Sequence, residues 1–121
     1  MSPAVRGNVE IFPTADELTA AAAERFVACA AAAIESTETF SVALSGGSTP
    51  HALFALLATP PYASRVQWPR VHVFWGDERC VPPDHDDSNY RMADEMLLSH
   101  VPVRAANIHR IRGEESPDLA A

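Results

Sequence analysis

Residues 40–50, Phe40-Ser41-Val42-Ala43-Leu44-Ser45-Gly46-Gly47-Ser48-Thr49-Pro50, decide how this chain is expected to fold. The first five residues alternate between larger apolar and small side chains, a pattern typical of a strand with one buried face. Two glycines and three hydroxyl residues follow, and an apolar helix is then predicted from Pro50 to about Thr59. Pro50 suits the first helical position because its missing amide hydrogen would be unpaired there. This stretch therefore predicts a strand, a tight turn and a helix.

The turn over residues 45–49 is a candidate anion site. Its glycines let backbone amides approach a ligand, its hydroxyls can donate hydrogen bonds, and the helix N-terminus adds partial positive charge. The ligand we expect is a phosphate, held by Ser45, Gly46, Gly47, Ser48 and Thr49. No Lys follows the glycines and a third glycine is missing, which excludes the nucleotide P-loop and the dinucleotide fingerprint. The same residues are equally compatible with a tight turn that only caps the helix.

A second polar segment follows a second predicted strand. Val71–Trp75 is a nearly continuous apolar run, which predicts a strand covered on both faces. It ends in Gly76-Asp77-Glu78-Arg79, whose charges are costly to hold at a buried strand end without partners or a ligand. Ligands of open parallel sheets bind beyond the carboxyl ends of the strands, so we expect both loops to share one site, roughly 5 to 10 Å apart. The alternative is a salt-bridged loop without a ligand.

Four further elements complete the pattern. We predict an edge strand at Asn8–Phe12, a helix from Ala15 to about Glu35, a helix from Asn89 to Leu98 and a strand at Asn107–Ile111. The first helix has a capping box at Thr14 and Glu17 and an apolar stripe at Leu18, Ala22, Phe26, Cys29 and Ala33; the second is capped by Ser88 or Asp87 and turns Met92, Met96 and Leu97 inward. Alternating strands and helices predict right-handed crossovers and a mostly parallel sheet.

Length and charge narrow the classes of function. The 121 residues suit one domain, and nine cations, all arginine, against 16 acidic residues give a net charge of −7, which argues against a nucleic-acid partner. The longest apolar stretch, Phe26–Ile34, is nine residues, too short to span a membrane, and the N-terminus shows no secretory signal. We therefore expect a soluble cytoplasmic protein in which Cys29 and Cys80 are reduced thiols, a disulfide being the less favoured alternative.

Several other polar residues have simpler interpretations. Asp84-His85-Asp86-Asp87 is expected to be a solvated loop with a helix cap, because four consecutive loop residues rarely converge on one metal ion. His72, inside an apolar strand, is expected to be hydrogen-bonded structure. Cys80 follows Arg79 but is expected to be an inert thiol.

Four motifs in order resemble the 6-phosphogluconolactonase family. They are Leu44-Ser45-Gly46-Gly47-Ser48-Thr49-Pro50; Phe74-Trp75-Gly76-Asp77-Glu78-Arg79 with Val81-Pro82; Ser88-Asn89-Tyr90-Arg91-Met92; and Asn107-Ile108-His109-Arg110-Ile111. Glucosamine-6-phosphate deaminases share the fold and a Gly-Ser-Thr-Pro turn but differ at the second motif. The resemblance implies a three-layer α/β fold with helices on both faces of a mostly parallel sheet.

The resemblance also implies an activity. The family hydrolyses 6-phospho-D-glucono-1,5-lactone to 6-phospho-D-gluconate, which requires a base to activate water and donors for the developing oxyanion, and no metal or organic cofactor. The partner implied is therefore a small sugar phosphate. Ser45 to Thr49 would line its pocket, and Arg79 would grip the phosphate or other substrate oxygens. Asp77 would act as a catalytic residue that orients a hydroxyl or the base.

One departure from the family is large. The histidine of a Gly-Asp-Gly-His type motif, the family's proposed general base, is missing from this sequence. We therefore expect residues 1–121 to be a single α/β domain that forms the N-terminal part of a larger lactonase domain, inactive alone. Two alternatives stay open: a glucosamine-6-phosphate deaminase or isomerase, and a sugar-phosphate sensing domain of a transcription regulator. The first 40 residues contain no helix-turn-helix pattern, which weighs against the sensor.

Overall fold

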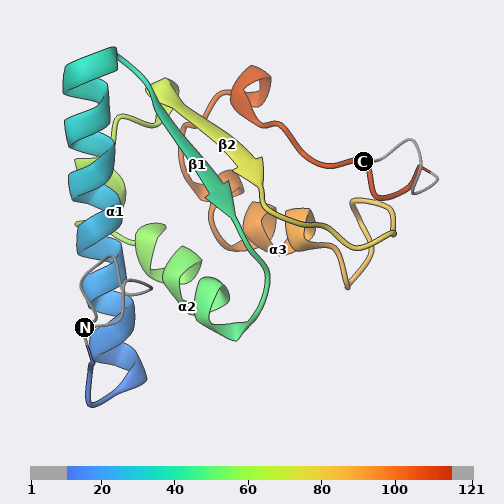
Figure 1. Cartoon of the computed structure of the whole chain (residues 1–121), viewed down its shortest axis with the longest axis horizontal. Coiled ribbons are helices and arrows are strands. Elements are labelled where there is room, and N and C mark those ends of the chain that lie inside the picture. The colour runs from blue at the N-terminus through green and yellow to red at the C-terminus, as the bar shows by residue number, and fades with distance from the viewer. Residues whose placement is uncertain (1–10, 116–121) are drawn as a thin grey trace, which may run out of the picture.

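The computed structural model describes residues 11–115, in which helices lie against one face of a small parallel sheet (Figure 1). The order along the chain is helix α1 (Ala15–Thr37), strand β1 (Phe40–Leu44), helix α2 (Ser48–Leu57), strand β2 (Val71–Trp75) and helix α3 (Asn89–Met96). Short 3-10 turns lie at Ala63–Arg65, Trp68–Arg70, Leu98–His100 and Ala105–Asn107. The strand predicted over residues 8–12 lies largely outside the described residues, and Ile11 and Phe12 are not part of a strand.

Helix α1 begins where its capping residues predict. The Thr14 hydroxyl accepts a hydrogen bond of 3.1 Å from the backbone N–H of Glu17, and Glu38, in the left-handed conformation with φ 70°, ends the helix. The predicted stripe is displaced by one residue: the buried positions are Ala23, Val27, Ala30 and Ile34, while Cys29 is exposed. Because alanines flank both stripes, the residue pattern alone does not distinguish them.

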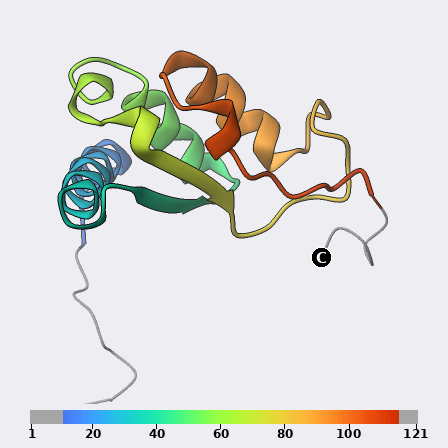
Figure 2. The ribbon, with the colours of Figure 1, turned by 90° about the horizontal axis from the view of Figure 1, so that it is seen from above.

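Strands β1 and β2 are hydrogen-bonded neighbours that run parallel, with Phe40 opposite Val71 and Leu44 opposite Trp75. Their buried side chains share one face, against which the helices pack (Figure 2). The alternation predicted for β1 is confirmed. The prediction that β2 is covered on both faces is wrong for the described residues: Phe74 is 40% exposed, because α1, α2 and α3 all pack on the other side.

Four element boundaries differ from the predictions, and the first is the end of helix α1, which lies at Thr37, two residues later than expected. Helix α2 begins at Ser48, so Pro50 is its third residue and not its first. Because no N–H in the first turn of a helix has a partner within the helix, proline is tolerated at any of these positions and does not fix where the helix begins. Helix α2 ends at Leu57 and α3 at Met96, each two residues earlier than expected. The strand predicted at Asn107–Ile111 is wrong: that segment makes one isolated parallel bridge, between Val73 and Ile108.

The core lies between the sheet and the helices. Its largest fully buried side chains include Trp68, Leu57, Leu97 and Val71, each contributing about 2 kcal/mol through burial of apolar surface. The Trp68 indole N–H donates to the carbonyl of Ala63 at 2.9 Å, so this ring is buried with its polar atom paired. Within residues 11–115, no helix combines the length and apolar character that crossing a membrane requires.

Candidate ligand-binding site

The two polar loops leave the sheet at the same edge. Leu44 and Trp75, the last residues of β1 and β2, lie opposite each other, and the N–H of Gly76 donates to the Leu44 carbonyl at 3.0 Å. The expectation that the two strands lie close together is confirmed, and the glycine-rich loop and the Gly76–Arg79 loop start side by side.

The glycine-rich loop leaves the N-terminus of α2 open. Gly47 has φ 109° and ψ 174°, a region that only glycine adopts without strain, and it caps α2 without a side-chain hydrogen bond. Ser48 and Thr49 are the first two helical residues, and Pro50 has no N–H. The backbone amides of Ser48 and Thr49 are therefore available to an anion, as at other helix N-termini that bind phosphate.

The second loop is held by one carboxylate. Oε1 of Glu78 accepts from the N–H groups of Arg79 and Asn89, both at 2.7 Å, while Oε2 accepts from Ser88 Oγ at 3.0 Å and the Tyr90 N–H at 2.9 Å. Burial raises the pKa of Glu78, but these four hydrogen bonds together outweigh burial and bring that pKa below its ordinary value. Glu78 therefore fastens the loop to the N-terminus of α3.

The predicted alternative of a salt-bridged loop does not describe this geometry. Within residues 11–115, none of Asp77, Glu78 and Arg79 forms an ion pair; Glu78 is bound by neutral donors instead. The neighbours of Glu78 along the chain, Asp77 and Arg79, are exposed. An anchored residue between two exposed charged residues is an arrangement that presents those charges to solvent or to a ligand.

Asn89 joins the two loops. This first residue of α3 is 6% exposed, and its Nδ2 donates to the Asp77 carbonyl at 3.2 Å and lies 3.5 Å from Asp77 Oδ1. On the other side it lies against Gly46, where an added Cβ would overlap the Asn89 amide oxygen. Gly46 is therefore required for close approach, and Asn89 sets the distance between the two loops.

A hollow of about 550 Å³ opens beside Asn89. It is lined by Gly47, Arg79, Asp86, Asp87, Ser88, Asn89 and Met92. The guanidinium of Arg79 makes no hydrogen bond or ion pair with any residue in the described range 11–115, so it is free to bind an oxyanion. The loops at the carboxyl ends of both strands thus contribute to one cavity. The loop after β1 contributes the backbone of Gly47, and the loop after β2 contributes the guanidinium of Arg79.

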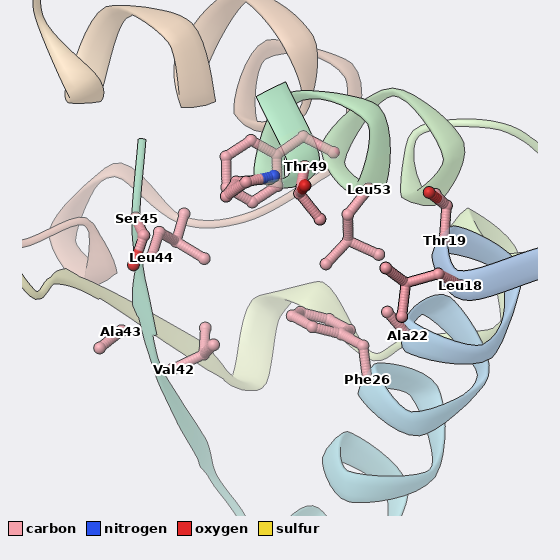
Figure 3. A pocket seen from close by; sticks show the side chains of 12 residues that line it. Leu18, Thr19, Ala22, Phe26, Val42, Ala43, Leu44, Ser45, Thr49 and Leu53 are labelled. Atoms are coloured by element: carbon pink, nitrogen blue, oxygen red, sulfur yellow. The ribbon is translucent and has the colours of Figure 1, made fainter. Parts of the chain in front are cut away.

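The remaining predicted site residues are placed differently. Ser45 and Thr49 line a separate, mainly apolar pocket of about 270 Å³ between α1, β1 and α2, where Phe26, Val42 and Leu53 point toward one another (Figure 3). Ser48 is exposed on the first turn of α2. Asp77 lies beside the hollow, against Asn89, and does not line it.

The other polar residues adopt the simpler arrangements. Arg91 pairs with Asp86 and Glu95 and donates to the Asp84 carbonyl at 2.9 Å, so it fastens the acidic loop to α3. His72 Nδ1 lies 3.4 Å from His109 Nε2, as expected of a hydrogen-bonded residue. Cys29 and Cys80 are free and exposed. In the part of the chain that the structure describes, no three His, Cys, Asp or Glu side chains are arranged to hold a metal.

Sequence reasoning missed the roles of Glu78 and Asn89. The Glu78 side chain bonds residues 10 to 12 positions along the chain, and the Asn89 side chain bonds Asp77, 12 positions back. Both contacts span a loop without regular structure, and no local pattern reports such a distance. One signal was available in the sequence. Asn89 directly follows the Ser88 cap, in a helix predicted to pack on the sheet, and a polar side chain that is buried there needs hydrogen-bond partners.

Comparison with known proteins decides the family. Residues 13–121 match the family model of glucosamine-6-phosphate isomerases/6-phosphogluconolactonase. The chain belongs to this family. It is 42% identical over 110 residues to a 6-phosphogluconolactonase of Haemophilus influenzae, an alignment that covers 91% of this chain and 46% of that protein. The chain thus spans about half the length of the curated relatives it matches.

Solved structures confirm the fold class. The crystal structure of devB protein is similar with a TM-score of 0.83 and 45% identity, over 92% of this chain and 45% of that one. A monomeric glucosamine-6-phosphate deaminase has a TM-score of 0.75 over 88% of this chain and 44% of the other, at 16% identity, a likeness that shows the fold alone. The α/β architecture with a parallel sheet, expected from the sequence, is therefore the family's architecture.

Proposed function

We propose that the protein takes part in hydrolysis of 6-phospho-D-glucono-1,5-lactone and that residues 45–49 and 76–79 form the part of its site that grips the substrate. The observation that carries this proposal is the shared hollow, where the loop at the open N-terminus of α2 meets the guanidinium of Arg79, which is unpaired among residues 11–115. A relative at 42% identity is named for the same reaction.

The phosphate is assigned to Arg79 and the α2 N-terminus. A guanidinium binds two oxyanion oxygens at once, and the backbone amides of Ser48 and Thr49, which follow the hollow-lining Gly47, supply neutral donors. This local positive potential is needed because Asp86 and Asp87 also line the hollow and the protein carries a net charge of −7. The ion pair of Arg91 with Asp86 partly offsets that negative charge.

The remaining predicted residues take supporting roles. Asp77, whose carboxylate lies beside the hollow, would orient a substrate hydroxyl or the base that activates water. Gly47 allows the loop to approach the ligand, Gly46 leaves room for Asn89 within the site, and Ser45 and Thr49 shape the side of the loop that faces the apolar pocket. In the reaction, water adds to the lactone carbonyl, the ring C–O bond breaks, and a carboxylate, a hydroxyl and a proton are formed.

The free state of both cysteines supports a cytoplasmic location, because thiols stay reduced there.

The small-molecule partner implied by the site is a phosphorylated polyhydroxy acid or its lactone. Reaction of the intact parent protein with the lactone, followed as acid release above the buffer blank, tests the activity. Ammonia release from glucosamine 6-phosphate would favour the deaminase alternative, and binding of 6-phosphogluconate without turnover would favour the sensing domain.

Arg79→Ala tests the grip on the phosphate. We expect its dissociation constant for 6-phosphogluconate to rise about 30-fold, corresponding to about 2 kcal/mol, with little change in melting temperature. Isothermal titration calorimetry measures the affinity. Arg70→Ala is the matched control, since it removes the same charge from the opposite end of β2, where Arg70 bonds the Glu38 carbonyl. Equal affinity of wild type and Arg79→Ala would contradict the assignment.

A further inference from the structure

Residues 108–113 run alongside β2 and on toward the candidate site. Ile108 forms a parallel bridge with Val73, and the N–H of His109 donates to the Val73 carbonyl at 2.8 Å. From this point the segment and the loop after β2 leave the sheet in the same direction (Figures 1 and 2). At Gly113 the segment meets that loop. A segment that forms no strand of its own thus links the middle of β2 to the candidate site.

Gly113 packs directly on the backbone of the loop. It is buried, although its neighbour Arg112 is exposed. A Cβ added to Gly113 would overlap the Arg79 carbonyl oxygen and would lie 2.9 Å from the Val81 carbonyl oxygen. Both oxygens belong to the backbone, so they cannot rotate away as the end of a flexible side chain can. Gly113 is therefore required for the two segments to approach this closely.

This contact completes the fixing of the Arg79 backbone. The N–H of Arg79 donates to Glu78 Oε1 at 2.7 Å, and its carbonyl oxygen accepts from the Val81 N–H at 2.8 Å and lies against Gly113. Its guanidinium has no partner among residues 11–115. Because no other side chain holds the guanidinium, its place in the hollow depends on where the backbone of Arg79 is held. Glu78 holds the N–H side of that backbone, and Gly113 holds the carbonyl side.

We propose that Gly113 is a positioning residue for the phosphate of the substrate: by lying against the Arg79 carbonyl, it keeps the loop where the guanidinium reaches the hollow. This inference rests on the proposed function and adds to it a residue that does not line the hollow. A bidentate hydrogen bond needs aligned donors, so a displaced backbone weakens the grip although every group that touches the ligand is still present. If Gly113 served the fold alone, its substitution would lower the melting temperature and leave the affinity of the folded protein unchanged.

A double-mutant cycle in the intact parent protein separates these roles. Gly113→Ala is expected to weaken 6-phosphogluconate binding about tenfold, measured by isothermal titration calorimetry at a temperature where circular dichroism shows all variants folded. Because this effect passes through the Arg79 guanidinium, adding Gly113→Ala to Arg79→Ala should weaken binding by less than about a further twofold. The same loss in both backgrounds, or no loss in the wild-type background, would overturn the proposal.

Arg112→Ala is the matched control for a change in the same segment. Its side chain is exposed and pairs with Glu115, and it carries the same charge as Arg79. We expect its affinity for 6-phosphogluconate to stay within about twofold of the wild type, because exposed charges at a distance are screened by salt. A loss as large as that of Gly113→Ala would show that the contact with the Arg79 carbonyl is not what matters, and would contradict the proposal.

Hydrogen exchange of the wild type covers the case in which Gly113→Ala fails to fold. If the Gly113 contact favours ligand binding, ligand binding favours that contact by the same factor. Saturating 6-phosphogluconate is therefore expected to slow exchange of the Gly113 amide more than that of Arg70, whose N–H bonds the Gln67 carbonyl beyond the other end of β2. Equal slowing at both amides, or none at Gly113, would refute the positioning role and leave the phosphate grip of Arg79 standing.

Two other outcomes concern the proposed function itself. If the wild type neither binds 6-phosphogluconate nor hydrolyses the lactone, the proposed function is wrong and this inference falls with it. If the wild type binds but Arg79→Ala binds equally well, the assignment of the phosphate to Arg79 is wrong, and Gly113 then has no group to position.

Discussion

The two loops that form the candidate site are built in opposite ways. The loop after β1 takes its shape from backbone: Gly46 leaves room for Asn89, and Gly47 adopts a conformation reserved for glycine. The loop after β2 takes its shape from a side chain, because four donors converge on the Glu78 carboxylate. Asn89 contacts both loops and holds them at one separation.

This difference indicates what each loop can tolerate. A backbone-shaped loop fails when a side chain is added, and a loop held by a carboxylate fails when its charge or acceptors are removed. In both, the residues that give the loop its shape, Gly46 and Glu78, differ from those assigned to the ligand, Arg79 and the α2 N-terminus. Variants can therefore separate shape from binding.

The largest effect on stability is expected for Glu78→Gln. If Oε1 becomes the amide nitrogen, the backbone N–H groups of Arg79 and Asn89 both face another donor. If Oε2 does, the Tyr90 N–H faces a donor, whereas the Ser88 hydroxyl can turn to accept. We expect the free energy of unfolding to fall by about 3 kcal/mol, measured by urea denaturation. Glu95→Gln is the control on helix α3, which Glu78 contacts from the loop, since Glu95 forms an exposed pair with Arg91 and should cost less than about 1 kcal/mol. Equal losses would mean that Glu78 is no anchor.

The same contrast explains how much the sequence could predict. The Thr14 cap, the strands at 40–44 and 71–75 and the Ser88 cap rest on local patterns, and all are confirmed. The meeting of the two loops followed from parallel-strand geometry. The contacts of Glu78 and Asn89 are tertiary contacts between segments, which local patterns do not report. The segment at 107–111 has the apolar pattern of a strand, but it pairs with β2 only at Ile108, so it does not form one.

Adding one carbon to the glycine after each strand compares the loops directly. In Gly46→Ala the new Cβ would overlap Asn89 Oδ1, so we expect a loss of about 2 kcal/mol in unfolding free energy. In Gly76→Ala the nearest atom, the Leu44 carbonyl oxygen, is 3.9 Å away, so the change should lie within about 0.5 kcal/mol. Urea denaturation measures both. Similar losses in the two variants would show that Asn89 does not hold the first loop in place.

The smallest effect concerns acid stability. Because the pKa of Glu78 is lower in the folded protein than its ordinary value of 4.5, its contribution is complete above pH 4.5 and is lost as the pH falls through the folded value. Unfolding free energies measured from about pH 6 to about pH 3 should therefore fall less steeply in Glu78→Gln than in the wild type.

The hydrogen bond from Arg110 also lowers the pKa of Glu114, so Glu114→Gln is the matched control. That exposed pair is screened by salt, so its part of the acid slope should shrink in about 1 M NaCl while the Glu78 part persists. If the acid limbs of Glu78→Gln and the wild type coincide, the four hydrogen bonds to Glu78 do not stabilise its charged form, and the second loop needs another anchor.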